Sequence, residues 1–483
     1  MPQTTNRRRR KACVIGAGPN GLAAAIVLAQ AGLDVELFEA ESTVGGAART
    51  MELSLPGFQH DFGSAVYPMA AGSPFFNSLP LEHFDIEWIQ SSAALAHPFD
   101  DGTAVTLERE LVNTEAALGA DGHAWRNLME PFSSHWPEFA AGILGPVIAW
   151  PRHPFLLARF GLNAALSATT VAHLHFRTEP ARALFAGLAA HSFLRLDRAL
   201  SASFGLVLGA AAHAVGWPIL RGGAQSLSNA LAAYLIHLGG RITTSTPIHS
   251  LADLPDCDLT LCDISPRQLL ALAGENQLTP TYRRQLAAYK FGPAAFKVDY
   301  ALSRPIPWNA PACLRAATVH IGGTLAEIAA SEQAMATGRH AETPFVLLAQ
   351  PTLFDPSRAP AGRHIAWAYC HVPNGSTDSD ATLARIEAQI ERFATGFRDC
   401  VLARHVSTPA TLETMDANLI GGDIVGGAMN LRQILFRPTR RQYRTSAPDI
   451  YLCSASTPPG GGVHGMCGAN AARLALRHLG RDR

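Results

Sequence analysis

The N-terminal part of the chain alternates between short apolar runs and an amphipathic stretch. Residues 12–15 are uniformly apolar, as expected of a buried parallel strand. Apolar side chains then recur with the spacing of one helix face over residues 22–29, and Gly32 ends that pattern. Residues 33–38 form a second strand-like run that ends on Glu39. The pattern therefore predicts a strand, a helix and a second strand in succession.

The turn before this helix reads Gly16-Ala17-Gly18-Pro19-Asn20-Gly21 and fits the dinucleotide-binding pattern G-x-G-x-x-G. Gly16 allows the tight turn, Gly18 lets the backbone approach a diphosphate, and Gly21 lets the helix pack against the strand. Glu39 follows about 20 residues later, where an acid binds ribose hydroxyls. The arginines at 7–10 also suggest a twin-arginine export signal. An export signal needs neither three glycines nor an acid at these distances, so we interpret the stretch as a dinucleotide-binding unit.

Similar patterns recur further along the chain. Residues 217–251 read as a glycine turn, an amphipathic helix and a strand, and residues 258–272 add another strand and helix. Near the C-terminus, a strand at Ile450–Ser454 leads through a proline-glycine turn, Pro458–Gly462, into a helix. Glycine turns between strand and helix therefore occur near both ends of the chain.

Composition and charge restrict the class of protein. With 483 residues, 48% hydrophobic and 16% charged, the chain suits two connected globular domains. Lys+Arg and Asp+Glu both number 39, so no overall field attracts nucleic acid. Eight cysteines lie without a CxxC or a paired zinc spacing, which indicates reduced thiols in a cytosol-like compartment and gives no reason to assign a metal site.

No uninterrupted apolar run reaches the roughly 20 residues of a membrane-spanning helix. The stretch 139–162 comes closest, but prolines and arginines interrupt it. We expect two amphipathic helices there, in a cytoplasmic protein that could associate with a membrane at its surface.

A second glycine pair follows the ribose acid. Residues 40–50 contain Gly45-Gly46 followed by Arg49 and Thr50, and together with the C-terminal turn they resemble the FAD motifs of the flavin amine oxidase and phytoene desaturase superfamily. The resemblance implies non-covalently bound FAD, with an arginine near the diphosphate and the C-terminal turn facing the flavin. The cofactor-binding residues expected on these grounds are Gly16, Gly18, Pro19, Asn20, Gly21, Glu39, Ala40, Gly45, Gly46, Arg49, Thr50, Ser64, Pro247, Ile248, Ser454, Gly462, Val463 and Gly465.

Five further sequence segments resemble those of phytoene desaturase-like oxidoreductases in particular. They are residues 57–76, 292–308, 313–328, 353–375 and 419–427. The bacterial branch that resembles pyridine nucleotide-disulphide oxidoreductase domain-containing protein 2 is the most similar. This implies an α/β fold with a Rossmann-type FAD-binding domain assembled from residues 11–90, 215–285 and 405–483, after a basic flexible tail at 1–10. Residues 91–214 and 286–404 would form an α+β substrate-binding domain with a mixed or antiparallel sheet and a helical cap.

Two side chains are candidates for chemistry. Lys297 lies in an alternating strand-like stretch that is similar to the strand whose lysine holds a water against flavin N5 in flavin amine oxidases. His464 lies in the C-terminal turn, from which it could reach the flavin or the substrate and transfer a proton. His320 and His371 fall in the expected substrate-domain sheet and are interpreted as packing or hydrogen-bonding residues rather than catalysts.

The resemblance implies an FAD-dependent oxidoreductase that adds or removes hydrogen at C–C or allylic C–H bonds of a small hydrophobic, polyene or isoprenoid-like substrate, by hydride transfer to flavin N5. Oxygen or a quinone would be the electron acceptor, and the protein would be a monomer or a homodimer. Three alternatives stay open: a flavin amine oxidase, a redox-neutral double-bond isomerase, and a flavin-free lipid-binding escort protein.

Overall fold

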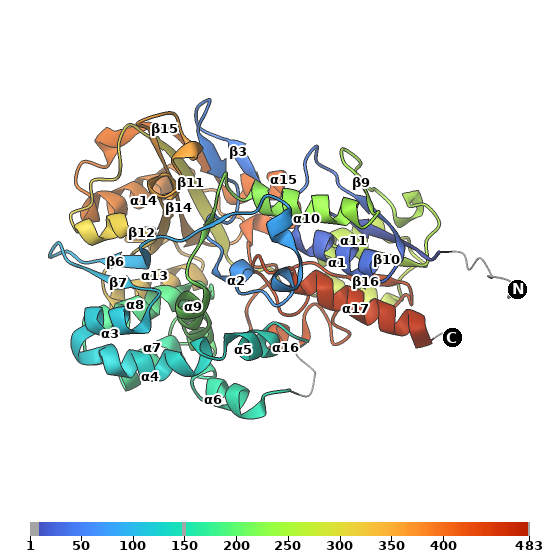
Figure 1. Cartoon of the computed structure of the whole chain (residues 1–483), viewed down its shortest axis with the longest axis horizontal. Coiled ribbons are helices and arrows are strands. Elements are labelled where there is room, and N and C mark those ends of the chain that lie inside the picture. Colours follow the sequence, from blue (N-terminus) through green and yellow to red (C-terminus); the bar gives the residue numbers. More distant parts are fainter. Residues whose placement is uncertain (1–8, 147–150, 482–483) are drawn as a thin grey trace, which may run out of the picture.

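A parallel sheet of five strands forms the half of the molecule that lies on the right in Figure 1. In this computed structural model, which describes residues 9–146 and 151–481, the strand order is β16-β10-β1-β2-β9. The strands are β1 (Lys11–Ile15), β2 (Asp34–Phe38), β9 (Arg241–Thr243), β10 (Leu259–Cys262) and β16 (Ile450–Leu452). The predicted strand, helix and strand at the N-terminus are confirmed. Residues 1–8 of the predicted basic tail lie outside the described residues.

The register of this sheet places the carboxyl ends of its central strands at one edge. Ile15 of β1 lies opposite Phe38 of β2 and also opposite Cys262 of β10. Cys262 in turn lies opposite Leu452 of β16. The residues that follow these strands are therefore brought together, although they come from three distant parts of the chain.

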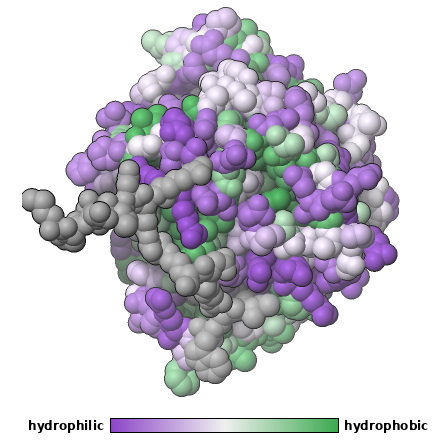
Figure 2. Space-filling model, turned by 90° about the vertical axis from the view of Figure 1, so that its right-hand side faces the viewer, coloured by the Kyte–Doolittle hydropathy of each residue, from purple (hydrophilic) through white to green (hydrophobic). Residues whose placement is uncertain are grey.

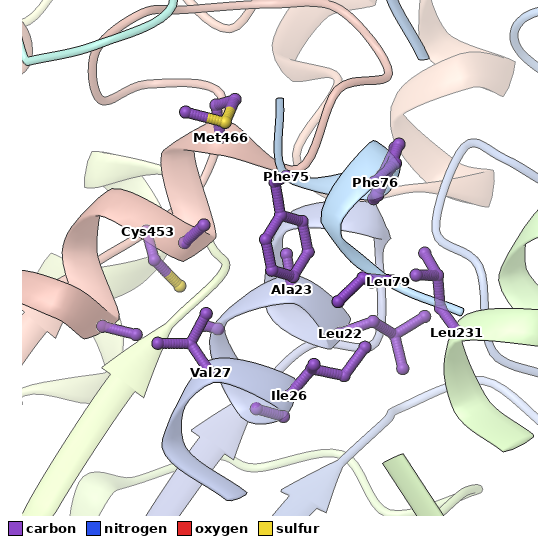
Figure 3. Close-up of a cluster of buried hydrophobic side chains, with 14 of the residues drawn as sticks. Leu22, Ala23, Ile26, Val27, Phe75, Phe76, Leu79, Leu231, Cys453 and Met466 are labelled. Carbon is purple, nitrogen blue, oxygen red and sulfur yellow. The ribbon is translucent and has the colours of Figure 1, made fainter. Parts of the chain in front are cut away.

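Three helices pack together beside this sheet. Helix α1 (Pro19–Gln30) lies between α17 (Met466–Arg481) and α10 (Gln225–His237). Figure 3 shows Leu22, Ala23, Ile26 and Val27 of α1 beside Phe75 and Met466 in the resulting core. Because α1 is buried along almost its whole length, its apolar stripe and the strands fix its N-terminus at the carboxyl edge of the sheet.

A second, mixed sheet of seven strands has the order β15-β11-β14-β13-β12-β6-β7. The pair β12–β6 is parallel and the remaining pairs are antiparallel. The strands are β6 (Ala93–Pro98), β7 (Ala104–Leu107), β11 (Ala294–Leu302), β12 (Ala316–Ile321), β13 (Val346–Ala349), β14 (His364–Val372) and β15 (Val401–Ser407). All nine residues of β11 are buried, so any charged side chain on this strand must find its partner inside the protein.

Helices gather below the seven-stranded sheet at the lower left of Figure 1. They are α3 (Leu111–Leu118), α4 (Gly122–Ser133), α5 (Trp136–Ile143), α6 (Pro154–Ala164), α7 (Ala168–His175), α8 (Glu179–Ala190) and α9 (Ser201–Val215). The remaining helices are α2 (Pro68–Ala71), α11 (Pro266–Leu272), α12 (Pro280–Ala287), α13 (Leu325–Ala336), α14 (Ser379–Phe393), α15 (Pro409–Met415) and α16 (Leu431–Phe436), with short two-stranded sheets β3 (Thr50–Glu52)–β4 (Gln59–Asp61) and β5 (Trp88–Ile89)–β8 (Ile219–Leu220). The α/β architecture with a parallel and a mixed sheet confirms the predicted fold class. The predicted domain boundaries stay a prediction, and β15 continues past the boundary expected at residue 404.

The surface mixes hydrophilic and hydrophobic residues on the face shown in Figure 2. Helices α6 and α7 expose Phe155, Leu162 and Leu174. Among the described helices none is by itself long and apolar enough to cross a membrane, while α6 and α7 pass that test as a pair bent by 98°. Association of this region with a membrane stays a prediction.

The contact between α1 and α17 generates a test of the fold. A Cβ atom on Gly468 of α17 would lie 1.8 Å from the carbonyl oxygen of Asn20 in α1. We therefore expect Gly468→Ala to lower the free energy of unfolding by about 1–3 kcal/mol, because the two helices must separate. Gly480→Ala in the same helix meets no heavy atom within 4 Å and should leave stability unchanged or slightly higher. Equal denaturation midpoints for the two variants would contradict this packing.

Candidate functional site

A cavity of about 650 Å³ runs between the carboxyl edge of the five-stranded sheet and the buried face of the seven-stranded sheet. One end, called the nucleotide end below, is lined by the glycine turn around Gly16–Gly18, the end of β2 and the loop after β2. Lys297 of β11 also lines the cavity, and mostly apolar side chains from α9, β13 and β14 line an apolar chamber on the side of the seven-stranded sheet. One cavity thus joins a nucleotide-type turn to an apolar chamber.

The glycine turn has the close approaches that its sequence predicts. Gly16 has a φ of +93°, and a Cβ atom on Gly21 would lie 1.9 Å from the carbonyl oxygen of Gly16. A Cβ atom on Gly46 would lie 3.1 Å from Cα of Gly18, so the two glycine loops approach each other directly. Gly18 and Gly46 both line the cavity, where they leave room for a ligand next to the backbone.

The carboxylate of Glu39 is held at the end of β2. Its Oε2 accepts a hydrogen bond from the backbone N–H of Ala17 at 2.7 Å, and its Oε1 accepts one from that of Glu41 at 2.9 Å. The side chain is buried and lines the cavity. Pro247 and Ile248 follow β9 and line the same end, as does Ala40. This carboxylate therefore lies where the sequence predicts a ribose-binding acid.

Arg49 is buried in the cavity wall. Its Nε donates to the carbonyl of Gly46 and its Nη2 to that of Met415, both at 2.7 Å. Its Nη1 has a longer contact, 3.7 Å, with the carboxylate of Glu41. The buried Oδ1 of Asn20, at the N-terminus of α1, has no partner among the described residues and also belongs to a lining side chain. A guanidinium, a helix N-terminus and two glycine loops form a suitable environment for a diphosphate.

Two carboxylates in this region, the buried Asp263 and the half-buried Asp416, escaped the sequence analysis. Asp263 follows β10, accepts a hydrogen bond from the N–H of Gly21 at 2.7 Å, and lines the cavity. Burial raises its pKa to about 8, and the charges of Asp416 and Glu39 add to the rise. Burial also raises the pKa of Asp416. Asp263 could have been found as an acid directly after a strand of the parallel sheet, whereas nothing near Asp416 in the sequence marks it.

The C-terminal turn meets the cavity only in part. Ser454, Gly462 and Val463 line it, but His464 and Gly465 do not. The Nδ1 of His464 accepts a hydrogen bond from the N–H of Met466 at 3.0 Å, and its carbonyl accepts one from Oγ of Ser73 at 2.6 Å. Burial lowers the pKa of this imidazole to about 4. Contrary to expectation, the ring faces the start of α17 rather than the cavity, so it is placed to position the turn.

Three other predicted residues also lie behind the cavity wall. Gly21 packs against Gly16, and the N–H of Gly45 donates to the carbonyl of Ala17 at 2.9 Å. The hydroxyl of Thr50 donates to Asp61 at 2.9 Å. These positions shape the wall without facing the cavity. The predicted residues that do line it are Gly16, Gly18, Pro19, Asn20, Glu39, Ala40, Gly46, Arg49, Ser64, Pro247, Ile248, Lys297, Ser454, Gly462 and Val463.

Lys297 forms a buried ion pair with Asp299, two residues further along the same face of β11. Burial lowers the pKa of Lys297 while the charge of Asp299 opposes that change. The Oδ1 of Asp299 lies 3.6 Å from Nδ1 of His60, whose Nε2 lies 2.7 Å from Oγ of Ser54. The sequence analysis missed Asp299 and His60. This row of polar groups leads from the cavity toward the half-buried Ser54.

Comparisons with known proteins identify relatives in sequence and in fold. Residues 14–78 match the NAD(P)-binding Rossmann-like domain. The chain is 26% identical to mouse pyridine nucleotide-disulfide oxidoreductase domain-containing protein 2 over 97% of this chain and 93% of that protein. It is 25% identical to the phytoene desaturase (lycopene-forming) of Pseudescherichia vulneris over 97% and 99% of the two chains. The crystal structure of an oxidoreductase from Methanosarcina mazei shares the fold, with a TM-score of 0.67, 16% identity, and coverage of 97% of this chain and 100% of that one.

The fold and the nucleotide-type cavity define an oxidoreductase of the Rossmann class that uses a flavin-type cofactor. Within that class, the chain is similar over nearly its whole length to pyridine nucleotide-disulfide oxidoreductase domain-containing protein 2 and to a phytoene desaturase.

The raised pKa of Asp263 predicts a pH-dependent stability. The folded protein keeps this proton up to about pH 8, whereas an unfolded aspartate loses it near 3.8. Between these values the folded state binds more protons, so this group makes stability fall as pH rises. From pH 5 to 8, wild type should lose on the order of 3 kcal/mol relative to Asp263→Asn. Chemical denaturation at both pH values measures this difference. The substitution Asp256→Asn at an exposed position is the control, and parallel pH profiles for wild type and Asp263→Asn would refute the assignment.

Proposed function

We propose that the protein is an FAD-dependent oxidoreductase that adds or removes hydrogen at a C–C or allylic C–H bond of an uncharged, hydrophobic small molecule. The observation that carries this proposal is one continuous cavity, which joins the Glu39 and Arg49 end to the apolar chamber lined by α9, β13 and β14. Relatives named for desaturation of phytoene and of a hydroxycarotenoid support the reaction class.

The residues present fit FAD. Glu39 would bind the ribose, the glycine loops and Arg49 the diphosphate, and the backbone at Pro247–Ile248 the adenine. Ser454, Gly462 and Val463 would contact the flavin end, since they line the cavity from the C-terminal turn. When bound, FAD supplies the two-electron acceptor or donor for the hydrogen at the substrate carbon.

The charges along the cavity favour an uncharged substrate over an amine. The carboxylates in the wall are Glu39, Glu41, Asp263 and Asp416, and all of them belong to the nucleotide end. Among the described residues, no carboxylate lines the apolar chamber, where an ammonium group would need one. Asp299 lies behind the wall and is already paired with Lys297. We therefore favour desaturase-type or reductase-type chemistry over amine oxidation.

Among the described residues, Lys297 and Arg49 are the two cationic side chains in the cavity wall. Burial lowers the pKa of Lys297, and the charge of Asp299 raises it again in part. The pair can therefore accept or release a proton next to the cavity. Apolar neighbours such as Trp367, whose ring centre lies 5.8 Å from Nζ, keep bulk water away from this ammonium. The chain thereby contributes positioning, water exclusion and one proton-carrying group.

The cofactor assignment is tested by the absorption spectrum of the purified protein and by acid release of its chromophore. We expect flavin bands and FAD in the supernatant. Glu39→Ala and Arg49→Ala should each weaken FAD binding about 10- to 100-fold, because each removes a charged hydrogen-bonding group from the cavity. Glu36→Ala, on the same strand but outside the cavity, is the matched control. A colourless protein that cannot be reconstituted with FAD would leave the flavin-free lipid escort as the better hypothesis.

The role of Lys297 is tested with Lys297→Met and with the double variant Lys297→Met/Asp299→Asn, which leaves no unpaired buried carboxylate. Both variants should retain FAD, since neither residue lies among the nucleotide-binding groups. Reoxidation of the dithionite-reduced holoenzyme by oxygen or by a soluble quinone should slow by roughly 100-fold if the lysine transfers a proton. Stopped-flow absorbance measures this rate without knowledge of the substrate. Wild-type rates in both variants, with both acceptors, would show that Lys297 has no such role.

A further inference from the structure

A polar spot in the wall of the apolar chamber is built from three elements. His191 directly follows α8, and its Nε2 lies 3.2 Å from Nε2 of His320 on β12. Thr318 lies two residues before His320 and therefore on the same face of that strand. The indole Nε1 of Trp217 donates to the Thr318 hydroxyl at 3.1 Å, and the indole and the His191 ring are 6.4 Å apart. His191, Trp217 and Thr318 all line the cavity.

Both histidines in this spot are neutral near pH 7. Burial lowers the pKa of His191 to about 3, and that of His320 falls well below its ordinary value for the same reason. Each ring therefore carries a single N–H, and the short contact between them requires that one donates and the other accepts.

The hydrogen-bond partners determine which nitrogen carries each proton. The Nδ1 of His320 is buried without a partner among the described residues. A buried N–H without an acceptor is rarer than an unused lone pair, so the proton of His320 lies on Nε2 and is donated to His191. His191 then accepts at Nε2 and must carry its own proton on Nδ1. That N–H has no hydrogen-bond acceptor in the described part of the protein.

Thr318 presents a second donor. Its oxygen accepts the hydrogen bond from Trp217, while its own hydroxyl hydrogen has no acceptor among the described residues. The surrounding wall is apolar, with Phe193, Leu208 and Leu347. Two hydrogen-bond donors thus lie at the apolar end of the cavity, where a ligand that offered no acceptor would leave them unsatisfied.

We propose that His191 and Thr318 form a subsite for an uncharged oxygen acceptor, so that the substrate is an oxygenated apolar molecule, a ketone, aldehyde or alcohol, rather than a pure hydrocarbon. This inference rests on the proposed function in taking the chamber as the substrate site. A carboxylate is a poorer match, because no cation accompanies the two donors and Lys297 is already paired. His191 and Thr318 are specificity-determining residues, and His320 positions His191.

The test compares two probes with the same carbon skeleton, limonene and its ketone carvone, on the flavin-loaded protein. Binding is followed through the fluorescence of the tryptophans, two of which, Trp217 and Trp367, line the cavity. The measured quantity is the ratio of carvone to limonene affinity, which cancels the hydrophobic contribution that the two probes share. We expect His191→Phe and Thr318→Val to lower this ratio about three- to tenfold, the effect of one lost hydrogen bond.

Conservative variants separate the lost hydrogen bond from a disturbed wall. His191→Gln and Thr318→Ser keep a donor and should retain most of the wild-type ratio, and His173→Phe at an exposed position should not change it. An unchanged ratio in both His191→Phe and Thr318→Val would overturn the subsite. Flavin content is measured on every sample, so that a failure of cofactor binding, which concerns the proposed function, is distinguished from a failure of oxygen recognition.

Discussion

The close contact of α1 with the ends of β1 and β10 is the constraint on which the rest of the structure depends. Gly21 can approach the carbonyl of Gly16 only because it has no Cβ atom, and its N–H donates to Asp263, 242 residues away in the sequence. This contact joins the first and middle segments at the carboxyl edge of the sheet. The C-terminal segment completes the edge, because β16 pairs with β10 and Gly468 lets α17 cross α1 closely. The cavity exists where these three segments meet.

Charge is distributed unevenly along the cavity, and the distribution follows what each end must hold. The nucleotide end combines a cation, a helix N-terminus and several carboxylates, one of which keeps its proton near neutral pH. On β11, the charges of Lys297 and Asp299 are paired with each other. The far end has only uncharged donors, because burial keeps His191 and His320 neutral. A charged group is therefore accommodated at the nucleotide end of the cavity and excluded from the apolar chamber.

The elements that sequence reasoning predicted well are those whose signal is local. The strand, glycine turn and helix around Gly16–Gly21, and the position of Glu39, follow from periodicity and spacing within one short stretch. Asp299 and His60 were missed because their contact depends on how β11 packs against a distant hairpin. The place of His464 in the turn was predictable from sequence, but the direction of its ring, which the hydrogen bond from the N–H of Met466 determines, was not. Side-chain direction in an irregular turn leaves no periodic signal.

The interpretation of His320 as a packing or hydrogen-bonding residue holds, but it did not reveal which residue the hydrogen bond reaches. A histidine in a buried strand is usually explained by a hydrogen bond inside the protein, and His320 does have one. Its partner, however, lies on the cavity wall, so the unused nitrogen of His320 affects which proton the neighbouring ring presents. The buried imidazole of His320, with one nitrogen unpartnered, thereby determines the tautomer of the cavity-lining His191, much as the hydrogen-bond partners of metal-ligating histidines determine theirs. The polarity of the substrate chamber is consequently set by residues that do not face it, and alignment of the lining residues alone would not reveal it.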